Sequence, residues 1–343
     1  MTGINKEKLK EAINRFDAIK IMVIGDVMLD QFIWGKVSRI SPEAPIPVVD
    51  VRDESRMLGG AGNVVHNICS LGARASLCAV VGRDEMGRRV VRELRKLGCP
   101  AEGIVVEESR PTTVKTRIVA HGQQVVRFDR ENRGKIAEES IEKILSCVRD
   151  SLADTSAVII SDYAKGVVCP KLMDGLRPLL SKNKVIWAVD PKVRDMRLFK
   201  GVTIFTPNQL EAESITGIRI DSNESLARAG EKLRKLVQCK AVLVTRGEAG
   251  MALIEKGQGM YFIPTVAREV YDVTGAGDTV IAAMTMGLAA GLTLREAATL
   301  ANFAAGIVVG KIGTAVVQSE ELINAIELFS GQQSAVRRLK ADG

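Results

Sequence analysis

A run of small residues around two glycines is the strongest chemical signal in the sequence. It reads Asp272-Val273-Thr274-Gly275-Ala276-Gly277-Asp278-Thr279 and is followed directly by VIAAMTMGLAAGL, which is a helical pattern. Glycines ahead of a helix leave backbone N–H groups free to face an anion, and the helix dipole adds to the attraction. We therefore expect the amides of Gly275, Ala276 and Gly277 to hold a transferring phosphoryl group. The loop is not a P-loop, because Lys and Ser/Thr do not follow the second glycine.

Asp278 stands at the start of this helix, where two roles are open to it. Its side chain can cap the first helical turn, as Asp often does. It can also stand beside the anion hole as a general base that takes the proton of an incoming hydroxyl.

A second glycine-rich stretch, Leu58-Gly59-Gly60-Ala61-Gly62-Asn63, also leads into a helical pattern. Paired glycines permit close approach of a ligand to the backbone, and Asn63 offers both a donor and an acceptor to a hydroxyl. Taken alone, the stretch fits ordinary turn glycines equally well.

The elements that must position these residues follow an alternating pattern. Short runs rich in Val and Ile alternate with longer helical patterns, which indicates a largely parallel sheet covered by helices. The expected strands are Ile21 to Ile24, Ser76 to Val81, Ala157 to Ile160, Val185 to Val189 and Ala241 to Val244. Five such units fit one doubly wound α/β domain.

Two stretches, 32–53 and 112–129, alternate polar and apolar residues instead. The second predicts a hairpin that turns near His121-Gly122. We read both as a small β-layer, exposed on one face, that covers a ligand cleft as a lid. Because exposed strands often pair between subunits, a homodimer is expected.

The bulk composition excludes several classes of protein. The 48 basic and 41 acidic residues give a net charge of +7, but the run from Arg88 to Lys96 has the spacing of the wet face of an amphipathic helix. The net charge is therefore the only feature of the sequence that favours nucleic-acid binding. The six cysteines show no metal-binding spacing, and neither a signal peptide nor a membrane span is apparent, so a cytoplasmic protein is expected.

Together the two glycine-rich stretches closely resemble the diagnostic motifs of the phosphofructokinase-B type, or ribokinase-like, carbohydrate kinases, and the resemblance covers nearly the whole chain. It implies a Rossmann-type three-layer α/β/α domain over residues 1–330 with a small β-sheet lid, followed by a tail over 331–343. It also implies sugar under the lid and ATP across the carboxyl edge of the sheet.

The resemblance assigns roles to individual residues. Asp26 and Asp30 match the family's acceptors of sugar hydroxyls, beside Gly59, Gly60 and Asn63. For ATP and Mg²⁺ the matching positions are Asn208, Gln209, Leu210 and Glu211, the turn Thr245-Arg246-Gly247, and Asn302. Asp272 and Thr274 match positions that bind a monovalent cation in many relatives; whether this protein needs K⁺ stays open. A helix cap at Asn208 and an exposed loop charge at Arg246 are the plain alternatives.

A narrower resemblance comes from stretches outside the two motifs. They are Gly25 to Asp30, Ser38 to Pro45, Ser161 to Gly166, Asp190 to Lys192 and Tyr271 to Thr274. They are similar to the D-glycero-β-D-manno-heptose 7-phosphate kinases of ADP-heptose and lipopolysaccharide synthesis, which make the 1,7-bisphosphate. Some relatives carry a fused nucleotidyltransferase domain, which this sequence lacks, so only the kinase step is implied.

A substrate that already carries a phosphate needs cations. Lys115, Arg117, Arg127, Lys165 and Lys192 are the candidates, since Arg presents a fork and Lys a point charge. Lys165 and Lys192 follow strands at the ligand-binding edge and are expected to meet the phosphate, whereas Arg117 and Arg127 can equally be exposed strand charges.

The expected reaction is in-line transfer of the γ-phosphoryl of ATP to the anomeric hydroxyl, with Asp278 receiving its proton. Rival hypotheses are a kinase for another sugar, sugar phosphate or nucleoside, and a non-catalytic sugar-binding regulator. A dinucleotide-binding oxidoreductase is disfavoured, because no GxGxxG follows the first strand.

Overall fold

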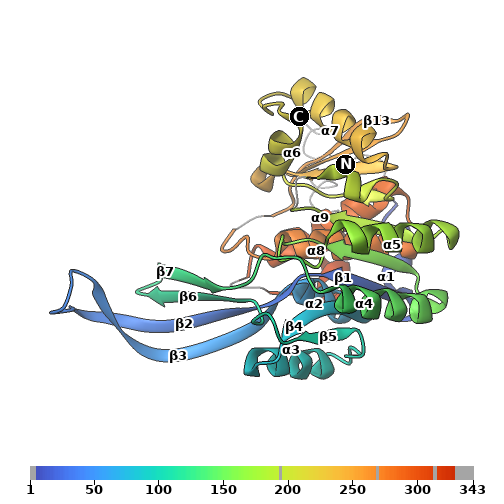
Figure 1. Ribbon diagram of the computed structural model, residues 1–343. Coiled ribbons are helices and arrows are strands. Elements are labelled where there is room, and N and C mark those ends of the chain that lie inside the picture. The colour runs from blue at the N-terminus through green and yellow to red at the C-terminus, as the bar shows by residue number, and fades with distance from the viewer. Residues whose placement is uncertain (1–4, 193–194, 268–269, 312–314, 329–343) are drawn as a thin grey trace, which may run out of the picture.

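A nine-stranded mixed sheet forms the centre of the molecule (Figure 1). The computed structural model describes residues 5–192, 195–267, 270–311 and 315–328. The expected boundary at 330 and the tail 331–343 lie outside these residues. In sheet order the strands are β13 (Gly259–Ile263), β12 (Met251–Glu255), β11 (Ala241–Thr245), β10 (Ile204–Phe205), β9 (Ile186–Asp190), β8 (Ala157–Ser161), β1 (Lys20–Gly25), β4 (Arg74–Gly82) and β5 (Ile104–Glu107).

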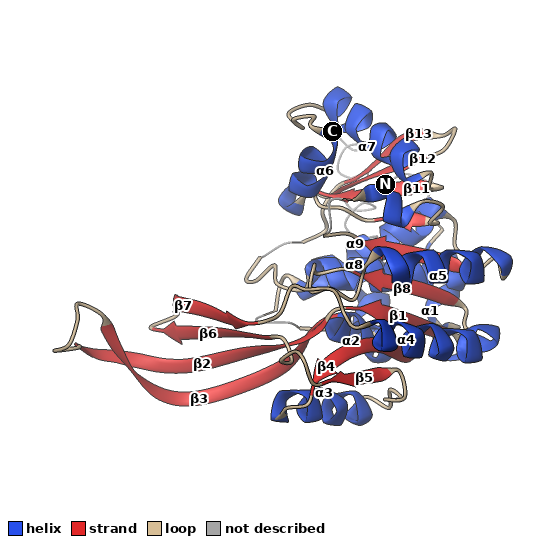
Figure 2. Ribbon diagram, in the orientation of Figure 1, coloured by secondary structure: helices blue, strands red, loops and turns tan. Residues whose placement is uncertain are grey.

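Helices cover both faces of this sheet, which confirms the three-layer α/β/α fold (Figure 2). One face carries α1 (Lys6–Ile13), α2 (Ala61–Ser70), α3 (Glu85–Lys96), α8 (Ala276–Ala289) and α9 (Leu294–Val308). The other carries α4 (Glu138–Ser151), α5 (Pro170–Lys182), α6 (Gln209–Thr216) and α7 (Asn223–Val237). Along β1, Ile21 and Val23 pack on the first face while Met22 and Ile24 pack on the second. Burial on both sides explains the nearly unbroken apolar strand sequences.

All five expected strands are present, and four further strands were missed. β10 has two residues and β5 has four, too few for a periodic signal. β12 and β13 form an antiparallel hairpin at one edge, which makes the sheet mixed rather than wholly parallel. The parallel register continues from β11 through β9, β8 and β1 to β5.

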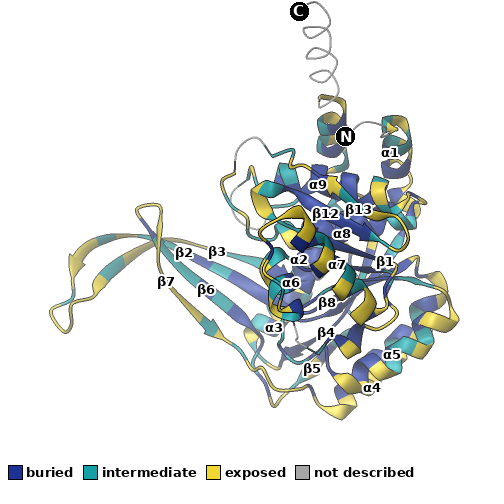
Figure 3. Ribbon diagram, turned by 90° about the horizontal axis from the view of Figure 1, so that it is seen from above, coloured by how far each residue is buried: buried dark blue, intermediate teal, exposed yellow. Residues whose placement is uncertain are grey.

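The lid is a second, four-stranded sheet in the order β3-β2-β6-β7. Its strands are β2 (Val27–Ile40), β3 (Pro47–Gly60), β6 (Val114–Ala120) and β7 (Gln123–Arg130). The first part is therefore longer at both ends than the expected 32–53, and the second, 114–130, is close to the expected 112–129. The β6–β7 hairpin turns at His121 and Gly122, as expected, with φ values of 52° and 76°. The sheet projects from the body and becomes exposed toward its tip (Figure 3).

No helix among the described residues is long and apolar enough to cross a membrane. All six cysteines are free; four are buried and two are half-buried, as expected of reduced core residues. α3 buries Val90 and Leu94 and turns its basic residues outward, mostly onto carboxylates of the same helix.

Candidate active site

Asp278 lies in the first turn of α8 and is almost completely buried, with 3% of its surface exposed. Its Oδ1 accepts a hydrogen bond from the Tyr163 hydroxyl and its Oδ2 accepts one from Asn63 Nδ2, each at 2.8 Å. The N-cap of α8 is Gly275, which has no side chain to cap the first turn. The capping role considered for Asp278 is therefore wrong, since the carboxylate points to other segments.

Burial raises the pKa of Asp278 to about 7, and the nearby charge of Asp30 acts in the same direction, while the bonds from Asn63 and Tyr163 oppose the rise. A carboxylate of this kind is basic enough to take a proton near neutral pH.

The glycine loop before α8 offers two free amides. Gly275 has a φ of 80°, which a residue with a Cβ adopts only under strain. Among the described residues, we find no acceptor for the N–H groups of Gly275 and Gly277. The N–H of Ala276 already donates to the Val273 carbonyl at 3.2 Å, so the three-amide anion hole expected from the sequence is reduced to two amides.

The second glycine stretch places Asn63 in the first turn of α2. A Cβ on Gly60 would lie 2.5 Å from the Asp26 carbonyl oxygen, and one on Gly59 would collide with the Asp30 carboxylate, so both glycines permit close packing. Asn63 is fully buried, and its Oδ1 has no hydrogen-bond partner among the described residues. That oxygen is a ready acceptor for a ligand hydroxyl beside Asp278.

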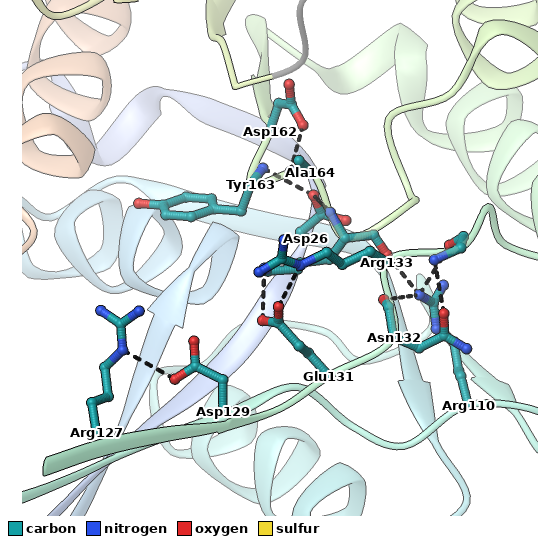
Figure 4. Close-up of polar contacts among 12 residues, drawn as sticks. Asp26, Arg110, Arg127, Asp129, Glu131, Asn132, Arg133, Asp162, Tyr163 and Ala164 are labelled. Carbon is teal, nitrogen blue, oxygen red and sulfur yellow. Dashed lines mark hydrogen bonds and ion pairs between the residues drawn. The ribbon is translucent and has the colours of Figure 1, made fainter. Parts of the chain in front are cut away.

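Asp26 holds a loop instead of facing a ligand. Its two carboxylate oxygens accept the backbone N–H groups of Tyr163, Lys165 and Val167 at 2.9 to 3.0 Å, and the residue is 1% exposed. Figure 4 shows the aspartate inside this loop. This arrangement corrects the expectation that Asp26 accepts a sugar hydroxyl.

The lid brings acidic and basic side chains over the site. Asp30 on β2 pairs with Arg117 on β6 at 2.5 Å, and Arg117 also lies over the Phe32 ring. Arg127 on β7 lies 3.2 Å from Asp129 and is half exposed (Figure 4). Asp30 and Arg117 are thus neutralised together, and Arg127 is partly solvated.

The two lysines expected at the sugar phosphate lie in different places. Lys165 is buried and pairs with Glu131 at 2.6 Å. Lys192 pairs with Glu211 at 2.5 Å, and both line a small cavity of about 150 Å³ with Asn208 and Gly277. Lys192 therefore lies beside residues that were expected to bind ATP, and its expected contact with the sugar phosphate stays a prediction.

A larger cavity of about 840 Å³ adjoins the small one and shares Asn208, Thr245 and Gly277 with it. Arg246, Gly247 and Asn302 also line the larger cavity, where Asn302 donates to the Pro264 carbonyl. The structure thus brings most of the residues expected to bind ATP to one continuous space beside the α8 N-terminus.

The Asn208 segment is a helix cap as well as a cavity wall. Asn208 and Glu211 form a capping box at the start of α6, so the plain alternative for Asn208 holds alongside its place in the cavity. Gln209 bonds to Glu213 and Arg246, and Leu210 is 75% exposed, so neither faces the small cavity.

A metal would have to be held here by few protein ligands. Among the described residues, no group of three His, Cys, Asp or Glu side chains is arranged to bind an ion. Hard oxygens of Asp190, Glu211 and Asn208 do surround the small cavity, which fits Mg²⁺ held largely through water and phosphate. Asp272 accepts the N–H of Thr274, so it shapes the loop at the position expected for a monovalent cation.

Sequence reasoning gave no role to Tyr163 or Asp190. Burial, and then the charge of Asp278, raises the pKa of Asp190 well above its usual value. Both residues lie in stretches that carried the narrower resemblance; Asp190 is the last residue of β9, and Tyr163 follows β8 by two residues, at the carboxyl edge of the sheet. That position is the signal that would have found them.

Comparison with known proteins agrees with this geometry. Residues 18–321 match the pfkB family carbohydrate kinase model. The chain is 44% identical to the bifunctional protein HldE of Citrifermentans bemidjiense over 98% of this chain and 69% of that protein, and 45% identical to that of Geobacter metallireducens over 95% and 66%. It spans about two thirds of the length of these relatives.

Solved structures show the same fold. Phosphofructokinase-2 of Escherichia coli in complex with potassium superposes with a TM-score of 0.74 at 19% identity, over 91% of this chain and 99% of that one. Ribokinase of Arabidopsis thaliana with ribose and ATP gives 0.72 at 19% identity, over 90% and 98%. The chain therefore belongs to the pfkB family of carbohydrate kinases and is an ATP-dependent sugar kinase.

Proposed function

We propose that this kinase phosphorylates D-glycero-β-D-manno-heptose 7-phosphate at O1 to give the 1,7-bisphosphate, as a step toward ADP-heptose. The observation that carries the proposal is the buried Asp278 carboxylate beside the free amides of Gly275 and Gly277. The similarity to proteins named HldE favours a heptose substrate within the family.

In the proposed reaction, the oxygen of the anomeric hydroxyl attacks the γ-phosphorus of ATP while Asp278 accepts the hydroxyl proton. The bond between the γ-phosphorus and the oxygen that bridges to the β-phosphate breaks, and ADP leaves. The amides of Gly275 and Gly277 stabilise the charge on the transferring group. The unpartnered Asn63 Oδ1 accepts a neighbouring sugar hydroxyl.

ATP is proposed to lie in the 840 Å³ cavity with its phosphates toward Lys192, Asn208 and Glu211. Mg²⁺, when bound with ATP, would neutralise phosphate charge at these oxygens. A K⁺ ion at Asp272 and Thr274 is part of the proposal, and a K⁺ titration of turnover tests it.

The phosphate of the sugar is proposed to meet the lid. Lys115 is half-buried, and burial lowers its pKa, yet no ion pair to it is found among the described residues. Lys165 and Arg117 lie near it and are already paired with carboxylates. The charges of Asp30 and Asp129 lie near Lys115 but form no ion pair with it among the described residues, and a half-buried ammonium that is not directly paired favours binding of an anionic group from the ligand.

The experiment that tests the substrate is an ADP-release assay with the heptose 7-phosphate, its dephospho analogue, fructose 6-phosphate and ribose. We expect the highest kcat/KM for the heptose 7-phosphate and a new anomeric phosphate in the ³¹P spectrum. A higher kcat/KM for fructose 6-phosphate or ribose would assign the enzyme to another sugar, and sugar binding without ADP release would indicate a regulator.

We also propose a cytoplasmic homodimer formed through the lid. Val126 and Phe128 on the edge strand β7 are 46% and 53% exposed, and Ile40 and Ile46 at the tip are 61% and 57% exposed. Light scattering should give twice the chain mass for the native protein and a lower mass for Phe128→Glu. A monomeric native protein rejects the dimer.

A further inference from the structure

Tyr163 reaches the catalytic carboxylate from a part of the chain far from both glycine motifs. Its hydroxyl donates to Asp278 Oδ1, while Asn63 donates to Oδ2, so each oxygen of one buried carboxylate has its own donor. We propose that Tyr163 is a positioning residue for the general base, fixing the orientation of the Asp278 carboxylate and stabilising its ionised form. The inference rests on the proposed role of Asp278 as the base.

The backbone of Tyr163 is held in place by the loop around Asp26. Its N–H donates to Asp26 at 2.9 Å, and the next residue, Ala164, has a φ of 54° and donates to Asp162. A Cβ on Gly166 would collide with the Gly134 carbonyl oxygen. Because the loop is fixed at so many points, the fold sets the position of the phenol before any ligand binds.

The ring of Tyr163 lies between the lid and the start of α2. Lys115 Nζ on β6 is 5.6 Å from the ring centroid. On the α2 side, a Cβ placed on Gly60 would lie 3.4 Å from Tyr163 Cδ2. The phenol therefore connects the lid cation to the base, and the glycine leaves room for the ring.

The charges around Asp278 decide what the phenol does. Burial raises the pKa of Asp278, Asp30 on β2 raises it further, and Lys115 on β6 lowers it. Asp190, the last residue of β9, is also near, and burial and then the charge of Asp278 raise its pKa. Burial and the same charge raise the pKa of Tyr163 well above its usual range, so the phenol keeps its proton and remains a donor at working pH. Loss of this donor removes support from the ionised base.

Tyr163→Phe keeps the ring and removes only the hydroxyl, so it separates hydrogen bonding from packing. The pH dependence of kcat/KM is measured for this variant, and Tyr261→Phe on β13, under the Arg295 guanidinium, serves as the matched control. Loss of the donor should move the acidic limb up by about one pH unit. Turnover at pH 6.5 should fall about tenfold and recover in part near pH 9. The KM for the sugar should stay within about threefold, because the hydroxyl bonds to the base and not to the ligand.

The control variant should reproduce the native profile. An unshifted acidic limb in Tyr163→Phe, or a loss confined to KM, overturns the inference. The native enzyme and Asp278→Asn are assayed beside it with the same sugar. If Asp278→Asn keeps its turnover, the base assignment itself fails; if it is inactive while Tyr163→Phe has the native profile, only the role of Tyr163 fails.

A second measurement does not depend on turnover, and it tests the same hydrogen bond if Tyr163→Phe folds poorly. The carboxylic C=O band of Asp278 is followed by infrared titration and assigned by its loss in Asp278→Asn. With 3-fluorotyrosine at position 163, a more acidic phenol donates more strongly, so the band should disappear at lower pH than in the native protein. A midpoint that is unchanged or raised contradicts the proposed bond.

Discussion

The hydroxyl of Thr279 donates to Asn67 Oδ1 at 2.8 Å; Thr279 directly follows Asp278 on α8, and Asn67 lies one turn after Asn63, the partner of Asp278, on α2. Asn67 in turn donates to the Asn63 carbonyl. This buried polar ladder joins α2 to α8, so the two glycine-rich motifs of the sequence are fixed to each other through their helices.

Breaking that ladder should cost stability. Thr279→Val leaves Asn67 Oδ1 buried without a donor, which should lower the free energy of unfolding by about 1–3 kcal/mol. The control is Thr299→Val on α9, whose hydroxyl bonds only to the Arg295 carbonyl one turn earlier in its own helix. Urea unfolding measures the free energy of unfolding of both variants. An equal decrease in the two would show that the bond between Thr279 and Asn67 adds no more stability than a hydroxyl bond within one helix.

Asp278→Asn should abolish turnover. The amide keeps the shape of the carboxylate but is not basic, so kcat should fall on the order of 10²-fold or more. ATP and sugar affinity, measured by calorimetry, should stay within about tenfold because the amide makes no new clash. Turnover close to that of the native enzyme would remove Asp278 as the base.

The same substitution should stabilise the fold at alkaline pH. The pKa of Asp278 is about 7 in the folded protein, against an ordinary value of 3.8. Protonation therefore favours the folded state, and native stability is lost as pH rises toward 7. In urea unfolding at pH 8, Asp278→Asn should therefore have a free energy of unfolding about 2–4 kcal/mol higher than that of the native protein. This difference should shrink as pH falls toward 5. A gain that is independent of pH contradicts the raised pKa.

The lysines should separate by ligand. Lys115→Met is expected to weaken binding of the heptose 7-phosphate about tenfold to a hundredfold, and to weaken binding of its dephospho analogue far less. Lys192→Met should weaken ATP instead, since it lies with Glu211 and Asn208. Lys256→Met, exposed between β12 and β13, is the control. If Lys115→Met weakens binding of both sugars equally, Lys115 on the lid does not bind the phosphate of the sugar.

Gly275→Ala should reduce turnover more than it reduces stability. The φ of Gly275 is 80°, so a Cβ strains the turn by about 1–2 kcal/mol and displaces an amide of the anion site. Gly257→Ala carries a similar strain, with a φ of 76° and open space around it, but lies in the turn between β12 and β13 and not in the loop before α8. Comparable kcat losses in the two variants would reduce the role of Gly275 to backbone strain.

The structural features that could be predicted were those encoded in periodic or local patterns of the sequence. Val/Ile runs gave five of the strands, and the glycine loop before α8 gave the position of Asp278. Which donor meets which carboxylate depends on tertiary approach, and no spacing encodes it. Asp26 looked like a free acid after a strand, yet its oxygens take three amides from a loop more than a hundred residues away. Lys165 and Lys192 each follow a strand in the sequence, but Lys165 pairs with Glu131 and Lys192 with Glu211.

The carboxylate of Asp278 depends on partners that precede it by 215 residues at Asn63 and 115 residues at Tyr163. Contacts of such long sequence separation form only when most of the chain is available. During synthesis on the ribosome, α2, the lid and the Tyr163 loop therefore emerge well before the helix that completes the base. With the proposed roles of Asn63 and Asp278, a nascent chain would hold part of the sugar site before it could transfer phosphate, and consumption of ATP would begin only after α8 has docked.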